Sequence, residues 1–124
     1  MEQKSYLERL IGKIVTKTDI NTSTAINLGN SNDEPANVKF EISLQLFLEE
    51  YLLDIYNPIT VIPSDKELPD FVGLKVVAIS DTKEEGELIF DNGYKIVVNM
   101  RDEAYYGPEA MCLYGPENLI VVWN

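Results

Sequence analysis

Carboxylates are the reactive groups that this sequence supplies in number. It holds 21 aspartates and glutamates against 10 lysines and arginines, and it has no histidine. Histidine is the commonest general base near neutral pH and the commonest metal ligand, so the usual acid–base chemistry is missing. The single thiol, Cys112, lies between Met111 and Leu113, which indicates a buried apolar side chain. We therefore predict a protein that is not an enzyme and has no catalytic residue.

Four acids gather in one short segment that could attract a divalent cation, namely Asp81, Glu84, Glu85 and Glu87. Calcium prefers such oxygen ligands. Lys83 sits among them, however, and the spacing lacks the alternating ligand pattern of a dedicated loop, which favours a solvated turn. Neither a Walker loop nor a dinucleotide fingerprint occurs. A distant carboxylate pair of the glycosidase type stays open. We expect no metal and no cofactor.

The segment 101–110 combines acids with tyrosines and contains a Gly-Pro step typical of a loop. Tyrosines in loops offer rigid contact area and a hydroxyl group, as binding surfaces require. We predict a partner-binding site here, made of Asp102, Glu103, Tyr105, Tyr106 and Glu109. The alternative is that one of the two tyrosines folds back onto the sheet and covers the core.

These residues must be positioned by strands, because period-two patterns dominate the chain. Apolar residues alternate with polar ones from Val38 to Leu46, which is typical of a half-buried strand. Further strands are predicted where β-branched and apolar residues concentrate, over 14–18, 23–28, 59–62, 74–79, 87–90, 94–100, 111–114 and 119–123. Residues 47–56 fit either a helix or a strand, and we favour strand. A short helix is expected over 5–11, ending at Gly12.

Turn residues divide the strands. Asp91-Asn92-Gly93 predicts a tight hairpin, because asparagine and glycine accept the positive φ that such a turn needs. Polar loops are expected over 29–35 and 63–69. The fold class is therefore mainly β (α+β): an antiparallel meander sheet or sandwich with a short N-terminal helix.

The chain length of 124 residues fits one domain over 1–124. Within it, 10–15 resembles 71–77, and Asn30 matches Asn92, at an offset of about 62. We interpret this similarity as a possible internal duplication over about 10–62 and 71–124, with chance resemblance as the alternative.

The net charge of −11 restricts the partners. Nucleic acid and anionic membranes need a positive surface, so we expect neither. A basic protein would instead be attracted. The first nine residues lack an apolar stretch, so we expect no secretory signal, and the cytoplasm is the expected compartment.

The second half of the chain resembles a group of small bacterial proteins. The residues that carry the resemblance are the Asp91-Asn92-Gly93 turn between strands, Tyr106 to Met111, and the closing Asn118 to Trp123. They are similar to immunity proteins of polymorphic toxin or contact-dependent growth inhibition systems. The resemblance implies binding and neutralisation of a cognate toxin, with a basic nuclease as the expected toxin class. The alternative is a non-enzymatic structural domain that forms homo-oligomers through edge strands such as 119–123.

Overall fold

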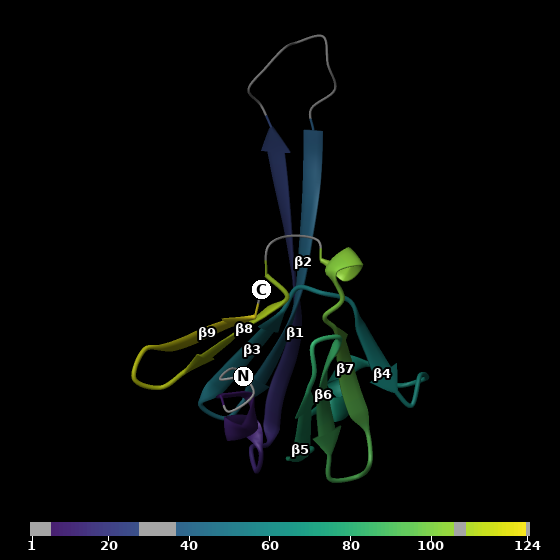
Figure 1. The fold of residues 1–124 in the computed structure, drawn as a ribbon, viewed down its shortest axis with the longest axis vertical. Coiled ribbons are helices and arrows are strands. Elements are labelled where there is room, and N and C mark those ends of the chain that lie inside the picture. Colours follow the sequence, from purple (N-terminus) through teal and green to yellow (C-terminus); the bar gives the residue numbers. More distant parts are fainter. Residues whose placement is uncertain (1–5, 28–36, 106–108, 124) are drawn as a thin grey trace.

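Two antiparallel sheets make up the molecule (Figure 1). The computed structural model describes residues 6–27, 37–105 and 109–123, with the side chains of 21–27 and 37–42 left out. The first sheet has the order β1-β2-β3-β8-β9 and the second β4-β7-β6-β5. The strands are β1 (Val15–Asn27), β2 (Asn37–Leu48), β3 (Tyr51–Ile55), β4 (Ile59–Ile62), β5 (Val76–Asp81), β6 (Glu85–Phe90), β7 (Lys95–Asn99), β8 (Met111–Gly115) and β9 (Leu119–Trp123). The predicted mainly β, antiparallel fold class is confirmed.

The chain passes from one sheet to the other twice. After β3 in the first sheet it crosses to β4, which pairs with β7 in the second sheet. After β7 it crosses back to β8, which pairs with β3. The crossovers meet, because the backbone N–H groups of Tyr56 and Asn57 donate to the Ala110 carbonyl at 2.8 and 3.1 Å. Each sheet therefore contains strands from both halves of the chain, and neither half has a complete sheet of its own.

One apolar core fills the space between the sheets. The first sheet contributes Leu46, Leu53 and Leu113, all fully buried, and the second contributes Leu88 and Ile96. Side chains alternate along a strand, so within the two packed sheets one side of each strand faces this core. Burying one such side chain contributes about 1.5–3 kcal/mol. The core therefore orients both sheets and leaves the opposite face of each directed outward.

Two matching glycine turns join the sheets where β1 and β5 begin. Gly12 and Gly73 have φ values of 91° and 93°, and each preceding residue is extended, as in a type II turn. The N–H of Gly12 donates to the Val76 carbonyl at 2.7 Å, and that of Gly73 donates to the Val15 carbonyl at 2.8 Å. The equivalent residues are 61 apart (73 − 12 and 76 − 15). Asn30, the other residue of the sequence comparison, lies outside the described residues.

Several elements differ from the expectation in detail. The helix expected over 5–11 is a 3₁₀ helix, η1 (Glu8–Leu10), which is too short for a full α-helical ladder. The strands expected over 14–18 and 23–28 form one continuous strand, β1, because its pairing with β2 runs without a break from Lys17 to Asn27. Residues 47–56, left open between helix and strand, form the end of β2, a turn at 49–50, and β3.

The hairpin predicted at Asp91-Asn92-Gly93 connects β6 and β7, and Gly93 has a φ of 90°. In the part of β2 whose side chains are described, Leu44 and Leu46 face the core as the alternation predicted, and Leu48 continues the pattern. Val38, Phe40 and Ile42 lie outside the described side chains, and the loop predicted over 29–35 lies outside the described residues. Figure 1 shows the β1–β2 hairpin projecting beyond the rest of the molecule. No helix among the described residues is long and apolar enough to cross a membrane.

Candidate functional site

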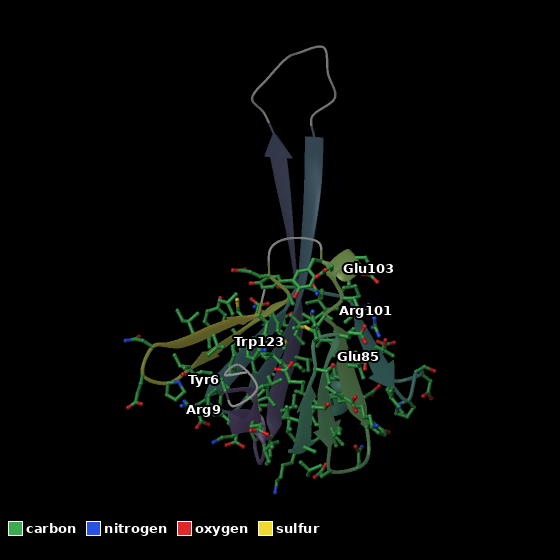
Figure 2. The ribbon with its side chains drawn as sticks, viewed as in Figure 1. Tyr6, Arg9, Glu85, Arg101, Glu103 and Trp123 are labelled. Atoms are coloured by element: carbon green, nitrogen blue, oxygen red, sulfur yellow. The ribbon has the colours of Figure 1, made fainter. Side chains whose placement is uncertain are left out.

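The acidic part of the predicted binding loop lies at the end of β7. Residues Asp102–Ala104 form a 3₁₀ helix, η3, within the crossover to β8. Ala104 is buried, and this holds the short helix against the molecule, while Asp102 and Glu103 are exposed. Figure 2 labels Glu103 on η3 and shows Arg101 directed toward Glu85 of β6. The segment expected to be a loop is thus partly helical, and it presents two carboxylates to the solvent.

Of the two tyrosines of this segment, only Tyr105 lies among the described residues. Tyr105 is partly buried and packs against the core. Burial raises the pKa of its hydroxyl, and the neighbouring charge of Asp102 raises it further. Tyr105 therefore follows the alternative in which a tyrosine folds back onto the core. Tyr106 lies outside the described residues.

Glu109 is associated with β8. It lies at the other end of the crossover, just before β8, and its charge contributes to raising the pKa of both Cys112 and Tyr114. The predicted site residues thus form two groups: Asp102 and Glu103 on η3, and Glu109 beside the side chains of β8. Sequence spacing alone did not separate these groups.

Cys112 and Tyr114 belong to the face of the first sheet that points away from the core, called here the outer face. Directly opposite residues form a row across all five strands of this face, composed of Asp19, Gln45, Asp54, Cys112 and Val122. The neighbouring row carries mostly apolar residues, namely Lys17, Phe47, Leu52, Tyr114 and Ile120. Ile120 is 62% exposed. The outer face therefore combines charged and polar residues with apolar ones, and its β9 edge is open.

Asp54 is the unusual residue of the outer face. Its side chain is only 9% exposed. One carboxylate oxygen, Oδ2, accepts a hydrogen bond from the Tyr56 hydroxyl at 3.2 Å. The other, Oδ1, is buried and has no hydrogen-bond partner among the described residues. Buried polar atoms are nearly always paired, so an exception calls for an explanation.

Sequence reasoning missed Asp54 because residues 47–56 were ambiguous between helix and strand. Once β3 is fixed, Leu53 and Ile55 face the core and Asp54 must face outward. An acid at an outward strand position usually signals a wet surface. Only the pairing of β3 between β2 and β8 shows that this acid is buried by its neighbours.

The hydroxyl and thiol groups near Asp54 have raised pKa values, so they ionise less readily at neutral pH than ordinary tyrosine and cysteine side chains. Burial raises the pKa of the Tyr56 hydroxyl, and the charge of Asp54 raises it further. Burial also raises the pKa of the Cys112 thiol, which lowers its thiolate fraction at neutral pH. The arrangement brings together a carboxylate, two phenolic hydroxyls and a thiol on one side of the first sheet.

The acidic turn considered as a calcium site is occupied by protein groups. Arg101 lies 3.6 Å from Glu84 and 3.8 Å from Glu85, and Lys95 lies 3.4 Å from Glu87. The Asp81 carboxylate accepts a hydrogen bond from the Trp123 indole N–H at 3.2 Å. No group of three or more candidate metal ligands occurs among the described residues.

The fold and this surface define a mainly β protein of two antiparallel sheets, each built from strands of both halves of the chain. No protein-family model matches the chain, and neither a curated protein nor a solved structure matches it significantly.

Proposed function

We propose that this protein is an immunity-type inhibitor that binds a basic toxin domain, such as a nuclease, and acts without catalysis. The observation that carries the proposal is the acidic crossover between β7 and β8. Asp102 and Glu103 are exposed there, and no ion pair between described residues includes either of them or Glu109. These carboxylates are therefore available to a partner.

The charge of the whole chain supports the same proposal. A net charge of −11 steers a basic partner toward the protein and repels nucleic acid. Nucleases carry basic surfaces because they grip phosphate, and carboxylates can occupy those surfaces in place of phosphate. Close charge pairs in a nuclease–inhibitor complex couple by about 1.5–7 kcal/mol, so a few well-placed acids suffice.

The test uses the toxin domain encoded next to this protein. The two purified proteins are mixed, and the dissociation constant is measured by calorimetry at about 50 and 300 mM salt. We expect a complex that weakens with salt, since exposed charges are screened, and protection of cells that express the toxin. Absence of a complex together with absence of protection would contradict the proposal.

The edge position of β9 favours a second candidate function, a self-associating β-domain. β9 is the last strand of the first sheet, and Ile120 on its outward side is 62% exposed. An apolar edge strand can pair with the same strand of another copy. Sedimentation analysis separates the candidates: a stable homo-oligomer that ignores the toxin domain would favour self-association.

A further inference from the structure

We propose that the outer face of the first sheet, centred on Asp54, binds an arginine or lysine side chain of the protein partner. This inference rests on the proposed function and names the place on the molecule where the partner's basic group docks. It uses a residue outside the acidic crossover that carries the proposed function.

The geometry places Asp54 in the middle of the outer face. Gln45 lies opposite it on β2 and Cys112 lies opposite it on β8. Tyr56, two residues further along the chain and just beyond the end of β3, donates its hydroxyl to Oδ2 at 3.2 Å. Both lone pairs of Oδ1 are left without a donor from the described residues. A donor from a second molecule is the group that would complete this site.

Energetics favour a cationic donor. A buried polar atom without a partner destabilises the free protein, and a charge-assisted hydrogen bond to it is about twice as strong as a neutral one. No neutral donor among the described residues bonds Oδ1, and the Tyr56 hydroxyl is engaged with Oδ2. Binding of a guanidinium or ammonium group would remove the cost that the free protein carries.

The surroundings also suit a basic side chain. Glu109 and Asp54 both act electrostatically on Cys112 and Tyr114, so two carboxylates share this small region. Tyrosine rings attract cations through their faces, and this chain already places Lys17 over the Phe47 ring, 5.2 Å from its centroid. Apolar residues of the outer face, with Ile120 on its β9 edge 62% exposed, would exclude water from the contact.

Docking requires a small rearrangement, because Oδ1 is covered in the free protein. Tyr56 is the side chain held directly to the carboxylate, by a single hydrogen bond of 3.2 Å. Rotamer changes of this kind are common when protein interfaces form. The incoming cation would therefore take its place beside Asp54 as Tyr56 moves.

The experiment compares Asp54→Asn with Asp65→Asn, which makes the same chemical change at an exposed position. Affinity for the neighbouring toxin domain is measured by calorimetry and stability by thermal unfolding. We expect Asp54→Asn to weaken binding at least about tenfold without lowering the unfolding temperature, and Asp65→Asn to change neither. As a second variant, Ile120→Lys leaves the core intact and should weaken binding by placing a like charge against the basic partner.

The outcomes separate the two proposals. If the wild type binds and both Asp54→Asn and Ile120→Lys bind equally well, this inference is overturned and the proposed function stands. If Asp54→Asn lowers the unfolding temperature sharply while Ile120→Lys binds normally, Asp54 is structural and the inference also fails. If the wild type does not bind the toxin domain, the proposed function fails. The site for a basic side chain is then tested separately, by titrating the protein with a hexa-arginine peptide and recording NMR spectra. Shifts at Asp54 and Tyr114 that vanish in Asp54→Asn support the basic-side-chain site, and their absence overturns it.

Discussion

Two buried polar side chains, Asp54 and Asn57, lie close together in the chain but differ in the hydrogen bonds that they make. Each has one oxygen without a partner among the described residues. The Asn57 amide, however, donates to the Asn99 carbonyl at 2.8 Å and so ties the β3–β4 crossover to β7. Among the described residues, the Asp54 side chain is hydrogen-bonded to Tyr56, two residues along the chain at the start of the β3–β4 crossover, and not to the second sheet. We therefore expect Asn57 to stabilise the fold and Asp54 to contribute to binding.

Asn57→Ala should destabilise the protein by about 1–3 kcal/mol, since it removes a side chain that is buried and hydrogen-bonded to the partly buried Asn99 carbonyl. Urea unfolding followed by tryptophan fluorescence measures the change, and Trp123 is a buried reporter in the first sheet. Ser64→Ala, at an exposed loop position, is the control and should be neutral. A stability of Asn57→Ala equal to that of the control would show that the crossover holds without this hydrogen bond.

The tyrosines of the outer face predict a loss of stability at alkaline pH. Folding raises the pKa of Tyr56 and Tyr114 above the ordinary value of 10.0, mainly through burial. Above about pH 10 the unfolded chain therefore binds fewer protons than the folded one, and stability falls as pH rises. Below that pH the tyrosines are protonated in both states, so this effect disappears.

Unfolding midpoints in urea between pH 8 and pH 11 measure this effect. Tyr56→Phe removes one of the titrating groups and should show a shallower decline above pH 10 than the wild type. Parallel curves for the two proteins would mean that Tyr56 titrates alike in the folded and unfolded states.

At the scale of elements, the two glycine turns connect the sheets through backbone hydrogen bonds. Both have φ near +90° and both leave open space where a Cβ would be, so the backbone conformation alone demands glycine. Gly12→Ala and Gly73→Ala should each cost about 1–2 kcal/mol, the usual penalty of a left-handed conformation for an L-residue. Thermal or urea unfolding of both variants measures the cost.

Gly86→Ala is the matched control for this pair. Gly86 has no positive φ, and its added Cβ would meet Met111 at an ordinary 3.4 Å. We expect Gly86→Ala to be close to neutral. If Gly12→Ala and Gly73→Ala differed strongly from each other, the two turns would not be equivalent, and the duplication predicted over 10–62 and 71–124 would lose support.

Local patterns of apolar and turn residues predicted where the strands lie, but they did not predict which distant strands pair with each other. The alternation before Leu46 and the Asp91-Asn92-Gly93 turn specify a strand and a hairpin through neighbouring residues alone. The two crossovers depend on pairings between distant residues, such as Ile55 with Met111, which no short window contains. For the same reason the acids of η3 could be predicted as exposed, whereas the burial of Asp54 depends on strands from both ends of the chain.

At the scale of the molecule, the chain crosses between the two sheets twice, and the candidate acidic surface lies on the second of these crossovers. η3 and Glu109 lie on the β7–β8 crossover, whose end at Ala110 accepts hydrogen bonds from Tyr56 and Asn57 of the other crossover. The Ala110 N–H in turn donates to the Trp123 carbonyl at 2.7 Å. A partner that bound η3 or Glu109 would contact residues next to these fixed positions, which would limit the entropy lost on binding.

Net charge and charge position can be separated with two triple variants. Asp102→Lys, Glu103→Lys and Glu109→Lys together change the net charge by +6, from −11 to −5. Glu8→Lys, Asp65→Lys and Glu117→Lys make the same change at exposed positions elsewhere. If the crossover is the interface, the first triple should weaken toxin binding by about a hundredfold or more. The second should only slow association modestly, because it alters long-range steering and no contact.

Association and dissociation rates measured at two salt concentrations distinguish these effects. Loss of a direct contact raises the dissociation rate, whereas loss of steering lowers the association rate and fades as salt screens the field. Circular dichroism should show the same β structure for both triples, since all six positions lie outside the core. Equal weakening by the two triples would mean that the protein attracts its partner through total charge alone, and the acidic crossover would then hold no special place in recognition.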